Sequence, residues 1–65
     1  MKQANDLIRI RELAKSIADS AMCIQDDCYD MEDLNNEDEL IPISSLVDSL
    51  RYKINTLYDL LKSEL

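Results

Sequence analysis

Apolar residues recur at intervals of three and four through the first half of the chain, beginning at Leu7. This spacing keeps them on one side of an α-helix, and the residues on the opposite side are all polar. We therefore predict an amphipathic helix over about residues 3–34. The apolar row runs Leu7, Ile10, Ala14, Ile17, Ala21, Ile24, Cys28 and Met31, and the polar row runs Asn5, Glu12, Asp19, Asp26 and Asp33.

A second row with helical spacing occupies the C-terminal half of the chain. Pro42 lies near its start, and a proline inside a helix removes one backbone hydrogen bond. We therefore predict that the second helix begins at or after Pro42 and covers about residues 43–64. Ser44 or Ser45 could cap it, and Ser45 with Asp48 approximates a capping box. The row runs Leu40, Ile43, Val47, Leu50, Ile54, Leu57 and Leu61.

The connection between the two helices is short. Because the chain has no Gly, Asn35 and Asn36 are the residues best suited to the left-handed conformation that often closes a helix. We expect the first helix to end near Asp33 or Leu34 and the connection to cover about residues 35–42. A connection of this length folds the helices back on each other. The predicted fold is a single all-α domain over residues 1–65, an antiparallel helical hairpin.

Each apolar stripe is wider than one neighbouring helix can cover, with Leu13 and Ala18 beside the first row and Leu46 and Leu60 beside the second. A chain of this length buries only about 60% of the surface that its unfolded form exposes. Oligomerisation is the expected aid, and we predict a homodimer that forms a four-helix bundle. Its expected core is Leu7, Ile10, Ala14, Ile17, Ala21, Ile24, Val47, Leu50, Ile54, Leu57 and Leu61.

Small residues such as Ala14 and Ala21 alternate in this core with large residues such as Ile17 and Ile24. The alternation resembles the layered core of the Rop family of dimeric hairpins, and it implies the same bundle architecture. The resemblance covers the core positions only. It implies no shared function, because RNA binding in that family relies on an exposed basic and aromatic face, and this chain has no Phe and no dense basic face.

Negative charge is concentrated near the connection. The chain has a net charge of −7, from 14 acidic and 7 basic residues. Residues 1–15 have a net charge of +2, residues 16–40 contain nine acids and no base, and residues 41–65 balance three acids against three bases. Like charges repel, so we expect paired hairpins to place their connections at opposite ends. We call the following eight residues the acidic tip: Asp26, Asp27, Asp30, Glu32, Asp33, Glu37, Asp38 and Glu39.

Three interpretations of the acidic tip are open at this point. It can be a solvated end that keeps the chain soluble, a surface that binds a partner, or a weak divalent-cation site built on Asp26 and Asp30. Asp30, Glu32 and Asp33 would stand in the last turns of the first helix, where the helix dipole disfavours negative charge. Such local violations often mark functional sites, so the partner-binding interpretation supplies a hypothesis of function.

The absence of Gly and His excludes several kinds of catalytic and binding site. Phosphate-binding loops, dinucleotide-binding fingerprints and EF-hand loops need Gly, and Ser–His or Cys–His nucleophiles need His; the chain has neither residue type. We expect no enzyme activity, no cofactor and no metal site. Cys23 and Cys28 are too far apart on one helix to bridge each other. The N-terminal stretch lacks the apolar run of a secretory signal, so we expect a cytoplasmic protein that does not enter the membrane.

Two classes of function fit these features. In the first, the acidic tip binds a basic protein and regulates or inhibits it. The charge density of the tip, about one charge per 2 Å of helix, is near that of a DNA duplex. The target could therefore be a nucleic-acid-binding protein, and small acidic anti-defence inhibitors such as anti-CRISPR proteins have a similar composition. We expect no direct binding of nucleic acid, because the net charge would repel phosphates. In the second class, the apolar flanks bind helices of another protein, as in a small chaperone.

Overall fold

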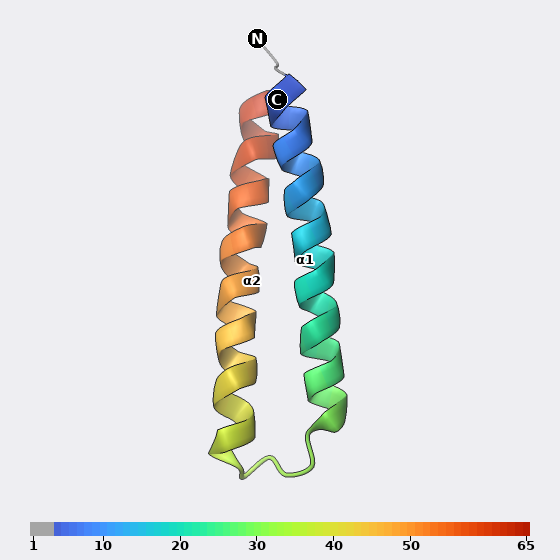
Figure 1. The fold of residues 1–65 in the computed structure, drawn as a ribbon. Helices are drawn as coiled ribbons and strands as arrows, with labels where there is room; N and C mark the ends of the chain where they lie inside the picture. Colours follow the sequence, from blue (N-terminus) through green and yellow to red (C-terminus); the bar gives the residue numbers. More distant parts are fainter. Residues whose placement is uncertain (1–3) are drawn as a thin grey trace.

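The computed structural model describes residues 4–65, which form two helices joined by a short connection. Helix α1 covers Ala4–Asp30 and helix α2 covers Glu37–Glu64. The helices lie side by side and antiparallel, so the start of α1 and the end of α2 are at one end of the molecule and the connection is at the other (Figure 1). The hairpin measures 51 × 15 × 13 Å along its principal axes. The prediction of an all-α helical hairpin is confirmed.

Helix α1 ends at Asp30, about four residues before the predicted end. The backbone N–H of Met31 closes it by donating a hydrogen bond of 3.3 Å to the carbonyl oxygen of Cys28. No residue between 4 and 65 has a positive φ, so the predicted left-handed closure at Asn35 or Asn36 is wrong. The early end keeps Glu32 and Asp33 out of the last turn, where they would add negative charge at the negative end of the helix dipole.

Helix α2 begins at Glu37, about six residues earlier than predicted. Asn36, with φ −91° and ψ 100°, is its N-cap, and the side chain of Asn36 accepts a hydrogen bond of 3.0 Å from the backbone N–H of Asp38. Glu37, Asp38 and Glu39 fill the first turn, where the positive end of the dipole favours carboxylates. The predicted caps at Ser44 and Ser45 are therefore wrong.

Pro42 lies inside α2, contrary to the prediction that the helix begins at or after it. Its ring nitrogen cannot donate to the carbonyl oxygen of Asp38, four residues earlier. Asp38 is exposed, so water can reach that part of the backbone. The Asn36 cap contributes about 1 kcal/mol and each first-turn carboxylate about 0.3–1 kcal/mol, which together offset a cost of about 3 kcal/mol for the proline.

The contact between α1 and α2 uses only part of each apolar stripe. Ile10, Ile17 and Ile24 of α1 are half-buried, as are Leu50 and Leu57 of α2, and the two helices contact each other. No residue between 4 and 65 is fully buried, because two helices enclose each side chain on one side only. We call the half-buried apolar residues the inner rows: Ile10, Leu13, Ile17 and Ile24 on α1 with Met31 directly after it, and Ile43, Leu46, Leu50, Leu57 and Leu60 on α2.

One polar contact crosses the middle of the hairpin. Lys53 donates a hydrogen bond of 2.9 Å from its Nζ to the Oγ of Ser20, and both residues are half-buried. A sliding of either helix by one turn would separate these two groups. The contact therefore favours a single alignment of α1 against α2.

The start of α2 can be tested by substitutions at its cap and at Pro42. Asn36→Ala should lower the free energy of unfolding by about 1 kcal/mol, because Asp38 loses the side chain that accepts its N–H. Pro42→Ala should raise it by about 1–3 kcal/mol, because the helix regains a hydrogen bond and loses a steric clash. Ser45→Ala is the control and should have little effect. Thermal and urea unfolding followed by circular dichroism measures all three, and a large loss from Ser45→Ala alone would place the start after Pro42.

Candidate functional site

The acidic tip combines carboxylates from three consecutive segments of the chain. Asp26, Asp27 and Asp30 lie in the last turns of α1, and Glu32 and Asp33 lie in the connection. The remaining three, Glu37, Asp38 and Glu39, form the first turn of α2. Because the connection reverses the chain direction, all eight residues gather at one end of the hairpin (Figure 1).

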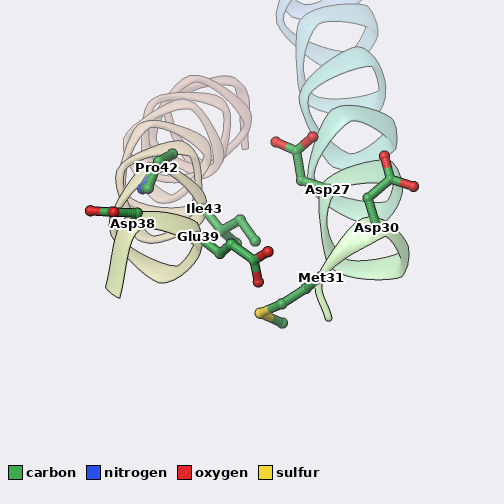
Figure 2. Close-up of a pocket in the computed structure, with 7 residues that line it drawn as sticks. All are labelled: Asp27, Asp30, Met31, Asp38, Glu39, Pro42 and Ile43. Atoms are coloured by element: carbon green, nitrogen blue, oxygen red, sulfur yellow. The ribbon is translucent and has the colours of Figure 1, made fainter. Parts of the chain in front are cut away.

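A hollow of about 250 Å³ opens between the helices at this end. Figure 2 shows the side chains of Asp27 on α1 and Glu39 on α2 extending toward the gap between the helices, while Asp38 points away from α1. Met31 and Ile43 lie beside Glu39 and give the hollow an apolar part. The full lining is Asp27, Asp30, Met31, Asp38, Glu39, Pro42 and Ile43.

Glu39 connects the two sides of the acidic tip. Its Oε2 lies 3.3 Å from the backbone nitrogen of Glu32 and 3.4 Å from that of Asp33, and it accepts a hydrogen bond from each. Within the connection, the N–H of Asn35 donates a hydrogen bond of 2.9 Å to Oδ1 of Asp33. These bonds give the connection a defined course without any glycine, and they explain why Glu39 is half-buried while most of the tip is exposed.

No basic side chain of residues 4–65 forms an ion pair with the acidic tip. An ion pair of 4.0 Å joins Arg51 and Asp48, which lie in α2 beyond its first turns. Six of the eight tip residues are also exposed, and the other two, Asp27 and Glu39, are half-buried. The tip therefore presents its charge to solvent, where a positively charged surface could meet it.

The cation-site interpretation finds no ligand set in the described residues. Asp26 and Asp30 lie one turn apart on α1, as predicted. Residues 4–65 contain no group of three or more His, Cys, Asp or Glu side chains placed to hold a metal ion. Both cysteines are free thiols and exposed.

The residues predicted as the dimer core divide into two sets. Ile10, Ile17, Ile24, Leu50 and Leu57 belong to the inner rows and pack within the hairpin. Six others are exposed and contact little within one chain: Leu7, Ala14, Ala21, Val47, Ile54 and Leu61.

Three residues that line the hollow were not assigned to the site from the sequence. Met31 and Ile43 belong to the predicted helical rows, and Pro42 marks the predicted helix start. Their place beside the carboxylates follows from where α1 ends and α2 begins. The signal that could have located them is Asn36 followed by three acids, which is a typical helix N-terminus.

Neither α1 nor α2, within residues 4–65, combines the length and the apolar character needed to cross a lipid bilayer. Comparison of the chain with family models, with curated proteins and with solved structures finds no match.

The two sides of the acidic tip should respond differently to neutralisation. Asp27→Asn with Asp30→Asn should raise the free energy of unfolding, because it removes charge that the C-terminal end of α1 disfavours and relieves repulsion within the tip. Glu37→Gln with Asp38→Asn relieves similar repulsion but loses a favourable interaction at the start of α2. The first variant should therefore be more stable than the second by about 1 kcal/mol at low salt. Equal stabilities in urea unfolding would contradict the helix ends described here.

Proposed function

We propose that this protein is a non-enzymatic acidic interaction protein whose acidic tip binds a basic protein and regulates or inhibits it. The observation that carries the proposal is the gathering of eight carboxylates at one end of the hairpin, with no basic residue between 26 and 39. Four of them surround a hollow that also has an apolar part. The two exposed thiols suit the reducing conditions of the cytoplasm, where we place the protein.

The hollow has the chemistry to take a lysine or arginine side chain of a partner. Carboxylates accept short, charge-assisted hydrogen bonds from ammonium and guanidinium groups. The aliphatic stems of these cations pack well on apolar surface, which Met31, Pro42 and Ile43 supply. Asp27 and Asp30 stand on the α1 side of the hollow, opposite Glu39, so one cationic side chain could contact carboxylates from both helices.

Net charge supports a basic partner more broadly. A charge of −7 on 65 residues attracts positively charged proteins over roughly 8 Å at physiological salt. A nucleic-acid-binding protein has the basic surface that such charge fits, and a phage-type inhibitor of a defence nuclease is one protein of this kind. The same charge repels nucleic acid itself.

We also infer that two hairpins associate into a homodimeric four-helix bundle. The hairpin exposes 5379 Å² of surface, whereas a compact monomer of 7.5 kDa exposes about 4,200 Å². Much of the difference is apolar, since Leu7 and Leu61 remain 49% and 47% exposed. A bundle would cover such residues and supply the enclosed core that one hairpin lacks.

A second function is supported by the same exposed apolar residues. Helices of another protein, in place of a second copy, could cover Val47, Ile54 and Leu61, and the protein would then act as a small chaperone or scaffold. In that case the acidic tip only keeps the complex soluble. The two functions differ in which surface the partner needs and in how salt affects the complex.

Affinity capture with charge-matched variants tests the proposed function. The tip variant carries Asp26→Asn, Asp27→Asn, Asp30→Asn and Asp33→Asn. The control removes four negative charges from exposed positions elsewhere: Glu12→Gln, Asp19→Asn, Asp48→Asn and Asp59→Asn. We expect the parent and the control to retain a basic partner that the tip variant loses, and we expect about 0.5 M salt to release it, because such salt screens exposed charges.

Equal capture of that partner by the tip variant and the control would overturn the proposed function. A partner that resists about 0.5 M salt and still binds the tip variant would support the chaperone function instead. Both variants must show the helical circular dichroism of the parent, so that a lost partner is not a consequence of unfolding.

A further inference from the structure

Every seventh residue of each helix forms an exposed, mainly apolar row beside the inner rows. On α1 all four residues of this row are exposed, and the exposed fraction of Leu7 is 49%. On α2 the exposed fraction ranges from 37% at Leu40 to 47% at Leu61. We call these the outer rows: Leu7, Ala14, Ala21 and Cys28 on α1, and Leu40, Val47, Ile54 and Leu61 on α2.

Both outer rows lie on the same face of the hairpin. On each helix, the outer row lies beside the inner rows, rotated from them about the helix axis by the same angle and in the same sense along the chain. Because the two helices run in opposite directions and face each other, this rotation brings both outer rows to the same side of the hairpin. The opposite face provides a check. Arg9, Ser16 and Thr56 each follow an outer-row residue by two positions, and they line one common hollow of about 310 Å³. We call the side with the outer rows the front face and the side with this hollow the back face.

The acidic hollow belongs to the back face. Asp30 and Pro42, which line it, also follow outer-row residues, Cys28 and Leu40, by two positions. The two faces therefore differ in chemistry. The front face carries an apolar row on each helix, and the back face carries the opening between the carboxylates.

We propose that the front face binds the front face of a second copy of this chain, with the two connections at opposite ends of the resulting bundle. The inference rests on the proposed association into a four-helix bundle and adds the surface and the orientation. A two-fold axis that joins the front faces in this way places α1 against α1 and α2 against α2. All neighbouring helices are then antiparallel.

Charge selects this orientation, because both helices carry the same imbalance. Residues 16–30 of α1 contain four acids and no base, and residues 37–50 of α2 also contain four acids and no base, so each half has a charge of −4. Residues 4–15 have three bases and two acids, and residues 51–64 also have three bases and two acids, so each half has a charge of +1. Opposite connections put every −4 half against a +1 half. Connections at the same end would put −4 against −4.

The exposed area matches a second copy in size. The hairpin exposes 5379 Å², which is about 1,100 Å² more than a compact chain of this mass. A typical stable interface buries about 800 Å² on each partner. A front-to-front dimer of this size would bring the exposure of each copy close to that of a compact protein.

Side-chain size also fits pairing of like helices. With opposite connections, the two-fold axis passes near residues 17 and 18 of α1, so the middle of the contact consists of Ala14, Ala18 and Ala21 from each copy. These small residues allow the two α1 helices to approach closely. The branched side chains of Val47 and Ile54 fill the wider space between the two α2 helices, so that small and large pairs alternate across the bundle.

The arrangement leaves the acidic hollow open. Because the hollow faces the back, the second copy does not cover it, and the bundle presents one acidic tip at each end. A partner with two basic sites, or two partner molecules, could bind the same dimer. Contacts at both ends would raise the apparent affinity without any new contact at either site.

The front face is tested by placing a charge on each side of α1. Ala21→Glu puts a carboxylate in the proposed interface, and Cys23→Glu puts the same group two residues away on the back face. Both positions are exposed in the hairpin, so neither change disturbs packing within one chain. In sedimentation equilibrium, the parent and Cys23→Glu should have twice the 7.5 kDa mass of the chain, and Ala21→Glu should have the mass of one chain.

Orientation is tested with labels and single cysteines. In a chain with Cys23→Ser and Cys28→Ala, a spin label on Asn36→Cys should report a separation of about 35–45 Å between copies, from the helix length at 1.5 Å per residue. In the same background, Ala18→Cys should form an intermolecular disulfide on oxidation, because the two copies of residue 18 meet beside the axis. Asp19→Cys, on the outward side, should not.

The outcomes separate the orientation from the association. If the parent protein sediments as a single chain at all concentrations, both the four-helix bundle and this inference are overturned. The function proposed for the acidic tip would still be supported in that case if the tip variant fails to capture the partner. A dimer with labels under about 20 Å apart keeps the bundle but overturns the orientation. A dimer broken by Cys23→Glu and not by Ala21→Glu overturns the choice of face.

Discussion

A single apolar contact between two antiparallel helices underlies the rest of this structure. The inner rows hold α1 and α2 together along their length, but each side chain is covered from one side only, and no residue between 4 and 65 becomes fully buried. Burial of apolar surface is the main favourable term in folding, so a chain with one such contact has little stability to spare. Because one hairpin buries so little, the outer rows remain exposed, and a second copy that covers them would add the missing burial.

At the connection, local electrostatics decides where the helices begin and end. The Asn36 cap and three carboxylates in the first turn of α2 favour a helix start that places Pro42 within the helix. The same type of charge has the opposite effect at the end of α1, where the helix stops at Asp30. Glu39 then accepts hydrogen bonds from the backbone of Glu32 and Asp33 and holds the connection against the start of α2. The acidic tip is therefore a shaped surface in addition to a concentration of charge.

The hairpin carries its exposed apolar rows and its acidic hollow on opposite faces. Its front face carries the exposed outer rows, while its back face carries the hollow between Asp27, Asp30 and Glu39. Association through one face leaves the other available. In the proposed function, the bundle serves as a rigid mount that holds the carboxylates in place and reduces the entropy lost when a partner binds.

The helical hairpin and the position of its charge could both be predicted from the amino-acid pattern. Spacing of three and four residues specifies one side of a helix, and the absence of basic residues from 26 to 39 is independent of any fold. The helix ends were predicted wrongly near Pro42 and Asn36, because the proline penalty was weighed without the cap and dipole that oppose it. Which apolar residues face the neighbouring helix depends on how the two helices pack. Ile10 and Leu7 belong to the same sequence pattern, yet one packs within the hairpin and the other is exposed, because periodicity defines the width of an apolar stripe and the direction of approach of the second helix selects the part that it covers.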